Sequence, residues 1–191
     1  MYKAIVIGSS AGGLNALKTF ISGLPAEFDL PIIITQHLNP HSDSYLTTYL
    51  SQQSHLKVKE ADPGDFIQNG YVYIAPPNMH LLVEEDFTLS LSNEEKINYS
   101  RPSIDILFET AARAYTKSLI GIILTGANHD GAFGIKQIKI FGGLTIAQNP
   151  ETAEVGTMPG AAIKTGSVDH IYNLEEIAPY IVSLWRSQIP N

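Results

Sequence analysis

The chain of 191 residues contains no cysteine. That absence excludes disulfide bonds, thiolate catalysis and cysteine-ligated zinc. No stretch reaches the roughly 20 apolar residues that a transmembrane helix needs, and the apolar run at 4–7 is too short for the core of a secretion signal. Basic residues are also few: the net charge of −7 argues against a general nucleic-acid-binding protein, which usually carries a basic face. We therefore expect a soluble, cytoplasmic protein that neither inserts into membranes nor binds nucleic acid.

The chain does have enough apolar residues for a core. They make up 44% of the sequence, which suits one domain spanning 1–191. Apolar patterning predicts strands at 4–7, 31–35, 57–60, 71–75, 118–125, 144–147 and 170–172. Helical spacing begins at Leu14 and recurs at 42–51 (capped by Ser42 or Asp43), 104–115, 131–141, 160–164 and 174–185. This alternation predicts an α/β protein with three layers and a doubly wound, mostly parallel sheet. Segments 80–83 and 88–92 predict an antiparallel hairpin at an edge of that sheet.

The glycine-rich turn at 8–13 lies between the first strand and the first helix. It lacks the Gly-Lys-Ser/Thr of a Walker A loop. A dinucleotide site would require an acidic residue at the end of the second strand, and none is present there. The letters Gly8-x-Ser10-x-Gly12 instead match a nucleophile elbow, whose serine sits beside a helix N-terminus. Ser9 and Ser10 could equally serve as caps of that helix.

Functional groups of an open parallel sheet collect at the carboxyl ends of its strands. Ser10 follows the first predicted strand, His37 follows the second, and Asp130 follows the strand that ends near Thr125. A serine hydroxyl needs a base to remove its proton, and the base needs an orienting partner. The sequence therefore predicts Ser10 as nucleophile, His37 as base and Asp130 as orienting acid. Asp130 also precedes a predicted helix and could be its N-cap.

Histidines other than His37 fit this scheme less well. His129, beside Asp130, is the one rival base, and its role stays open. The spacing of His37 and His41 suggests a metal pair, but Pro40 between them disfavours a regular helix and the glutamate of a His-Glu-x-x-His site is missing. We expect no metal and no cofactor.

Five segments of the chain resemble the CheB-type methylesterase domain, in order and at compatible spacing. They are 5–13 (IVIGSSAGG), 34–37 (ITQH), 101–108 (RPSIDILF), 123–126 (ILTG) with 130–132 (DGA), and 146–149 (IAQN) through 158–159 (MP). The resemblance implies a doubly wound α/β fold and hydrolysis of glutamate methyl esters on methyl-accepting chemotaxis receptors, with release of methanol. It also implies deamidation of some receptor glutamines. Carried over by motif, the family's nucleophile, base and acid fall on Ser10, His37 and Asp130.

The oxyanion of such a reaction needs backbone donors, which we place near Ala11 and Ala127, with Gly126 in the same loop. Ala11 and Ala127 stand where the family often has threonine and methionine, and Asn128-His129 replaces a more usual Gly-Asn pair. Many relatives carry an N-terminal receiver domain; none is expected within 1–191, so a separate regulatory protein is a possible partner. A small-molecule carboxylesterase and a non-catalytic α/β binding module remain as alternatives.

Overall fold

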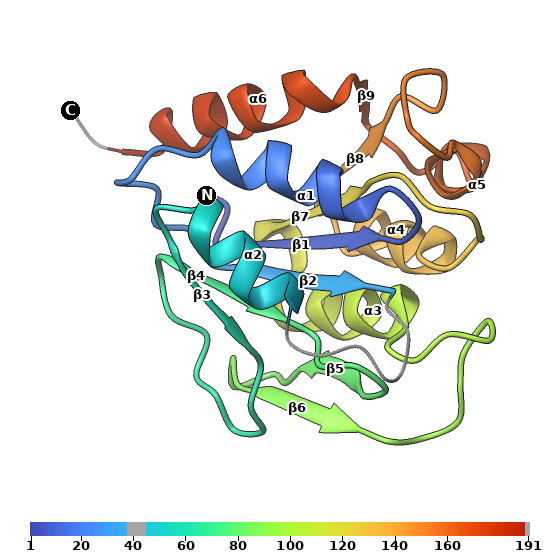
Figure 1. Ribbon diagram of the computed structural model, residues 1–191, viewed down its shortest axis with the longest axis horizontal. Coiled ribbons are helices and arrows are strands. Elements are labelled where there is room, and N and C mark those ends of the chain that lie inside the picture. The colour runs from blue at the N-terminus through green and yellow to red at the C-terminus, as the bar shows by residue number, and fades with distance from the viewer. Residues whose placement is uncertain (38–44, 190–191) are drawn as a thin grey trace.

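The computed structural model describes residues 1–37 and 45–189, and its main feature is one sheet of seven parallel strands (Figure 1). The order across the sheet is β3-β4-β2-β1-β7-β8-β9. The strands are β1 (Ala4–Ser9), β2 (Ile32–Gln36), β3 (Lys57–Glu60), β4 (Tyr71–Ile74), β7 (Leu119–Ile123), β8 (Leu144–Gln148) and β9 (His170–Tyr172). From β1 the chain first adds strands on the β2 side of the sheet and later adds β7, β8 and β9 on the other side. Such a switch in strand order is the place where α/β sheets form a crevice at the carboxyl ends of their strands.

Helices cover both faces of this sheet, which confirms the predicted three-layer α/β fold. One face packs against α1 (Gly13–Ser22), α2 (Tyr45–Gln53) and α6 (Leu174–Arg186). The other packs against α3 (Ile104–Tyr115), α4 (Ala132–Ile140) and α5 (Thr157–Lys164), and a short 3₁₀ turn, Thr116–Ser118, joins α3 to β7. The predicted caps of α2, Ser42 and Asp43, lie outside the described residues, as does His41. No helix in the described part of the chain is long and apolar enough to cross a membrane.

Two predicted elements differ in the structure. The hairpin of β5 (His80–Val83) and β6 (Leu89–Ser92) forms a separate two-stranded sheet and does not pair with an edge of the main sheet. Its apolar side is buried against α3, and the Val83 N–H donates to Thr110 Oγ1 on that helix at 3.1 Å, so it forms an outer layer. Helix α5 begins at Thr157 rather than near Gly160, because Pro159 lies in the first turn, where a helix needs no backbone donor.

Strand pleating decides which residues of β1 and β2 face which layer. Ile5 and Ile7 pack on the α1 side, whereas Val6 and, on β2, Ile33 pack on the α3 side. Gly8 continues the α3 face, and a Cβ there would lie 2.4 Å from Ile104 Cγ2 at the start of α3. The absence of a side chain at Gly8 therefore lets the N-terminus of α3 approach the end of β1.

Substituting Gly8 with alanine should push the start of α3 away from β1. We expect Gly8→Ala to lower the free energy of unfolding by about 1–3 kcal/mol, the usual cost of an extra methyl in a packed core. Urea unfolding measures this loss. The double variant Gly8→Ala/Ile104→Ala should lose less than the sum of the two single variants. Strict additivity would show that these residues do not crowd each other.

Candidate active site

The turn between β1 and α1 fixes Ser10 at the carboxyl edge of the sheet. The Ser10 N–H donates to Thr125 O at 2.9 Å, and Ser10 O accepts from the Gly13 N–H at 2.8 Å. Helix α1 has Gly12 as its N-cap, with a positive φ of 77° and no side-chain cap. The alternative that Ser9 or Ser10 caps this helix is therefore wrong, and the Ser10 hydroxyl is not used for that purpose.

Gln36, the last residue of β2, joins the ends of β1 and β2. Its Nε2 donates to both Ser10 O, at 2.8 Å, and His37 O, at 2.9 Å. Its Oε1 accepts from the buried Ser9 hydroxyl at 2.6 Å. The His37 N–H donates in turn to Ser9 O at 3.0 Å. The side-chain amide of Gln36 thus binds the backbone carbonyl groups of Ser10 and His37, two residues far apart in the sequence, at the ends of two adjacent strands.

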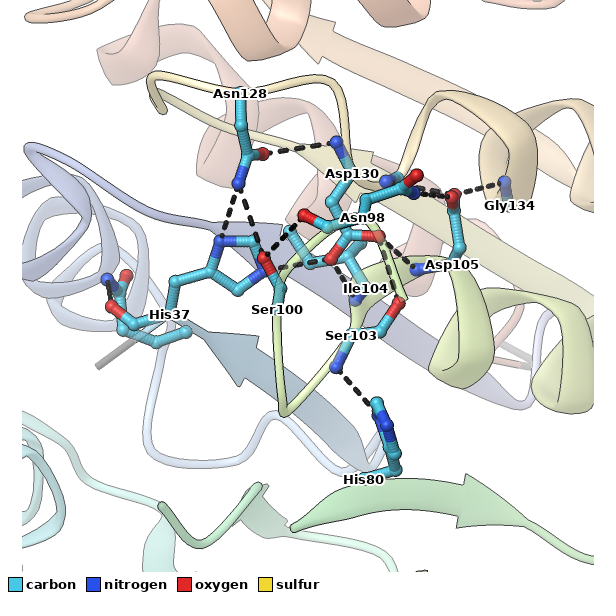
Figure 2. Close-up of polar contacts among 12 residues, drawn as sticks. His37, His80, Asn98, Ser100, Ser103, Ile104, Asp105, Asn128, Asp130 and Gly134 are labelled. Carbon is cyan, nitrogen blue, oxygen red and sulfur yellow. Dashed lines mark hydrogen bonds and ion pairs between the residues drawn. The ribbon is translucent and has the colours of Figure 1, made fainter. Parts of the chain in front are cut away.

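His37 and Asp130 form the central contact of the site (Figure 2). His37 Nε2 lies 2.8 Å from Asp130 Oδ2, and the two side chains are 12% and 0% exposed. The carboxylate also accepts from the N–H groups of Ile104 (2.7 Å) and Asp105 (3.2 Å) and from the Ser103 hydroxyl (2.9 Å). Burial alone would raise the pKa of Asp130, but the hydrogen bonds from His37 and the backbone hold that pKa below its ordinary value. Asp130 is therefore an anion at neutral pH.

Asn128 fixes the tautomer of the imidazole. Asn128 Oδ1 accepts the Asp130 N–H at 3.1 Å, which orients the amide so that its Nδ2 donates to His37 Nδ1 at 3.2 Å. The proton of His37 is then on Nε2, facing Asp130, and Nδ1 is the unprotonated nitrogen that accepts from Asn128. Both ring nitrogens have these other partners, so among the described residues the Ser10 hydroxyl makes no hydrogen bond to His37.

Asp130 caps a helix, although not the one expected. It binds the first turn of α3, whereas α4 begins after Gly131, which has a φ of 95° and makes no side-chain cap. The first turn of α4 is capped instead by Asp105 of α3, whose Oδ1 accepts from the N–H groups of Gly131 (2.9 Å) and Gly134 (2.7 Å). The two helices therefore exchange caps: each carboxylate satisfies the N-terminus of the other's helix.

Asp105 was not predicted from the sequence as a site residue. Burial, together with the nearby charge of Asp130, raises its pKa to about 6, despite the N–H groups that it accepts. Its other oxygen, Oδ2, accepts from Asn98 Nδ2 at 2.9 Å. The only sequence signal for it is an acidic residue in the first turn of a predicted helix, which usually indicates a favourable dipole interaction rather than a buried group.

Thr125 connects the turn after β1 to the loop before α5. Its Oγ1 donates to Ala11 O at 2.8 Å and accepts the Val155 N–H at 2.9 Å. Ala11 and Ala127 are exposed, and among the described residues no acceptor takes their N–H groups. Gly126 differs, because its N–H donates to Val155 O at 3.0 Å. Its expected place among the oxyanion residues is therefore corrected: Gly126 serves close packing, since a Cβ there would lie 2.7 Å from Met158.

The other described histidines lie elsewhere. His129 is exposed, and the contact with Asp130 belongs to His37. His80 is buried, with Nδ1 accepting the Ser103 N–H at 3.1 Å and Nε2 lying 3.0 Å from Glu95 O. In the described part of the chain, no group of three or more His, Asp or Glu side chains could hold a metal ion.

A cavity of about 680 Å³ lies at the opposite end of the sheet. Its lining includes Lys3, Pro31 and Asn69, which precede β1, β2 and β4, together with Tyr115 and Trp185. It is therefore separated from His37 by the length of the strands and takes no part in the site described here.

A doubly wound parallel sheet with a buried Asp–His pair at its carboxyl edge is an arrangement typical of hydrolytic enzymes. The sequence profile of the CheB methylesterase family matches residues 5–181, and the chain belongs to that family.

A relative from Leptospira interrogans is 52% identical over 188 residues, which cover 98% of this chain and 97% of that protein. The protein-glutamate methylesterase/protein-glutamine glutaminase of Thermotoga maritima is 37% identical over 95% of this chain and 54% of its own length. The crystal structure of the Thermotoga maritima CheB methylesterase catalytic domain superposes with a TM-score of 0.91 at 36% identity, over 96% of this chain and 99% of that one. The family resemblance read from the sequence is confirmed.

The raised pKa of Asp105 makes stability depend on pH. A carboxyl group whose pKa is higher in the folded than in the unfolded state binds its proton more tightly when folded, so its contribution favours folding at low pH. This contribution is lost as the pH rises from about 4 to about 6. Asp105→Asn keeps an oxygen for Gly131 and Gly134 and removes the charge. We expect the variant to gain stability relative to the original protein as the pH rises from 4 to 8.

Urea unfolding of both proteins across this pH range measures the difference, in which titrating groups distant from Asp105 and Asp130 cancel. A difference in unfolding free energy that is constant with pH would contradict the raised pKa.

Proposed function

We propose that this protein removes methyl groups from glutamate side chains of methyl-accepting chemotaxis receptors, as a serine hydrolase acting through Ser10, His37 and Asp130. Residues 1–191 would act as one catalytic domain in the cytoplasm. The observation that carries the proposal is the 2.8 Å contact between His37 Nε2 and the buried Asp130 carboxylate, at a strand end where Gln36 binds the carbonyl oxygens of both Ser10 and His37. Membership of the CheB methylesterase family supplies the ester chemistry.

The reaction would begin at His37 Nδ1, since Nε2 is committed to Asp130. Nδ1 takes the proton of the Ser10 hydroxyl as Ser10 Oγ attacks the ester carbonyl. For this step the Ser10 hydroxyl replaces the Asn128 amide as the partner of Nδ1. The charged imidazole that results is stabilised by the Asp130 carboxylate, which stays ionised.

The oxyanion of the tetrahedral intermediate would be bound by the N–H groups of Ala11 and Ala127, which lie in the turns after β1 and β7. The Nδ1 proton then passes to the departing methoxide, and methanol leaves. Water attacks the acyl-enzyme with His37 again as base, which frees the glutamate and restores the Ser10 hydroxyl. A receptor glutamine would react in the same way, with ammonia as the leaving group.

Methanol release from methylated receptor tests the proposal. Ser10→Ala removes the nucleophile and should lower kcat by at least about 10³-fold. Asp130→Asn should lower it by on the order of 10⁴-fold, because a neutral amide would neither hold the Nε2–H tautomer nor stabilise the charged imidazole. His37→Gln should be similarly impaired. The matched control is His129→Gln, which changes the exposed neighbouring histidine and should keep nearly full activity.

Two outcomes would identify the alternatives. Fast turnover of simple soluble esters without methanol release from receptor would indicate a small-molecule carboxylesterase. Full function of Ser10→Ala, together with no reaction of the protein with a serine-directed phosphonate, would indicate a binding module. A thermal unfolding curve for each variant shows whether a loss of activity comes from unfolding, which matters most for Asp130 because it also caps α3.

A further inference from the structure

A tight turn at Asn98 and Tyr99 lies beside the active site. Ile97 and Ser100 exchange two backbone hydrogen bonds: the Ile97 N–H donates to Ser100 O at 3.2 Å and the Ser100 N–H donates to Ile97 O at 2.8 Å. Asn98 and Tyr99 have φ values of 49° and 64°. Two successive positive φ values are the signature of a type I′ turn, in which Asn-Gly is the favoured pair. Asn98 suits its place, but Tyr99 stands where glycine would be least strained.

The Tyr99 side chain does not contribute to the core. It is 97% exposed, so neither burial nor packing compensates for the strained backbone. A bulky residue with a positive φ is unusual, and such strain is often kept at functional positions. The aromatic ring at this point therefore needs an explanation outside folding.

Side chains fix the turn beside the catalytic pair. Asn98 Nδ2 donates to Asp105 Oδ2 at 2.9 Å, and Ser100 Oγ accepts from Asn128 Nδ2 at 3.4 Å. The same Asn128 nitrogen donates to His37 Nδ1, so two hydrogen bonds connect the turn to the imidazole (Figure 2). Arg101 secures the base of the loop by donating to Asn78 Oδ1 at 2.9 Å.

A second exposed aromatic residue, Phe133, precedes a glycine whose N–H the same carboxylate binds. Asp105 accepts from Asn98 through Oδ2 and from the Gly134 N–H through Oδ1, so Asn98 and Gly134 meet at one side chain (Figure 2). Tyr99 follows Asn98 in the chain, and Phe133, which is 52% exposed, precedes Gly134. Tyr99 and Phe133 are thus carried by the two segments that Asp105 joins, next to the residues that hold Asp130.

We propose that Tyr99 and Phe133 form a docking surface, the aromatic rim, for the receptor helix that carries the methylated glutamate. This inference rests on the proposed function. A glutamate side chain is short compared with the 10–12 Å width of a helix, so an ester that reaches Ser10 brings its own helix against the edge of the site. Aromatic side chains have few rotatable bonds, so they lose little conformational entropy on binding, and they often dominate interface energetics. A small soluble ester reaches Ser10 without touching the rim.

The test compares two substrates on three variants. Tyr99→Gly relieves the turn and Phe133→Ala shortens an exposed side chain, so neither should unfold the protein. With methylated receptor, we expect each to lower kcat/KM by about tenfold, mainly through KM. With a soluble peptide that carries a glutamate γ-methyl ester, kcat/KM should change by less than about twofold. Phe66→Ala is the matched control, since Phe66 is 67% exposed and precedes β4 at the opposite end of the sheet.

If the unsubstituted protein is active on receptor and both rim variants keep its receptor kinetics, the proposal that the aromatic rim binds the receptor helix is wrong. An equal loss on receptor and peptide would also contradict it, because the residues would then shape the catalytic groups themselves. Failure of the proposed function gives a different result, in which the original protein releases no methanol from receptor at all. Unfolding curves should show Tyr99→Gly at least as stable as the original protein, which separates docking from folding.

Discussion

The buried carboxylate of Asp130 is the interaction on which this structure depends. A charge removed from water is costly unless it is surrounded by donors. Here three of the donors come from the start of α3, namely the Ser103 hydroxyl and the N–H groups of Ile104 and Asp105, and the fourth is His37 Nε2. The positive end of the helix dipole adds to this stabilisation. The carboxylate that orients the imidazole therefore also caps the N-terminus of a core helix, so the position of the imidazole depends on the same contacts that hold α3.

The exchange of caps between α3 and α4 extends this constraint. Asp105 and Asp130 each bind the N-terminus of the other's helix, which places two carboxylates close together in the interior. Their pKa values move in opposite directions, with that of Asp130 lowered and that of Asp105 raised to about 6. Such divergence is common in active sites, where neighbouring acids take different roles. Asp130 keeps its charge for His37, while Asp105 supports the loop and the helix start around it.

Much of the fold could be predicted from local pattern. Alternation of apolar strands with helical segments indicated the three-layer parallel sheet, and the rule that functional groups gather at strand ends brought His37 and Asp130 to one edge. The contact between them confirms that prediction. The catalytic role of Ser10 stays a prediction, because among the described residues its hydroxyl makes no hydrogen bond to His37.

Contacts between distant segments could not be predicted in this way. The roles of Gln36 and Asp105 depend on partners from other parts of the chain, and nothing in their immediate neighbours marks them. The same limit explains the cap assignments, since Asp130 precedes α4 in sequence yet binds α3 in space. The hairpin was predicted from its own residues, but its position depended on the apolar face that α3 offered.

The protonation of the His37 ring is the most direct test of this account. Nitrogen-15 NMR of the protein labelled at histidine distinguishes the two ring nitrogens at a pH where the imidazole is neutral. The structure predicts a protonated Nε2 and an unprotonated Nδ1 for His37, and loss of that preference in Asp130→Asn. A protonated Nδ1, or a mixture of tautomers indifferent to Asp130, would contradict the claim that this carboxylate prepares the base.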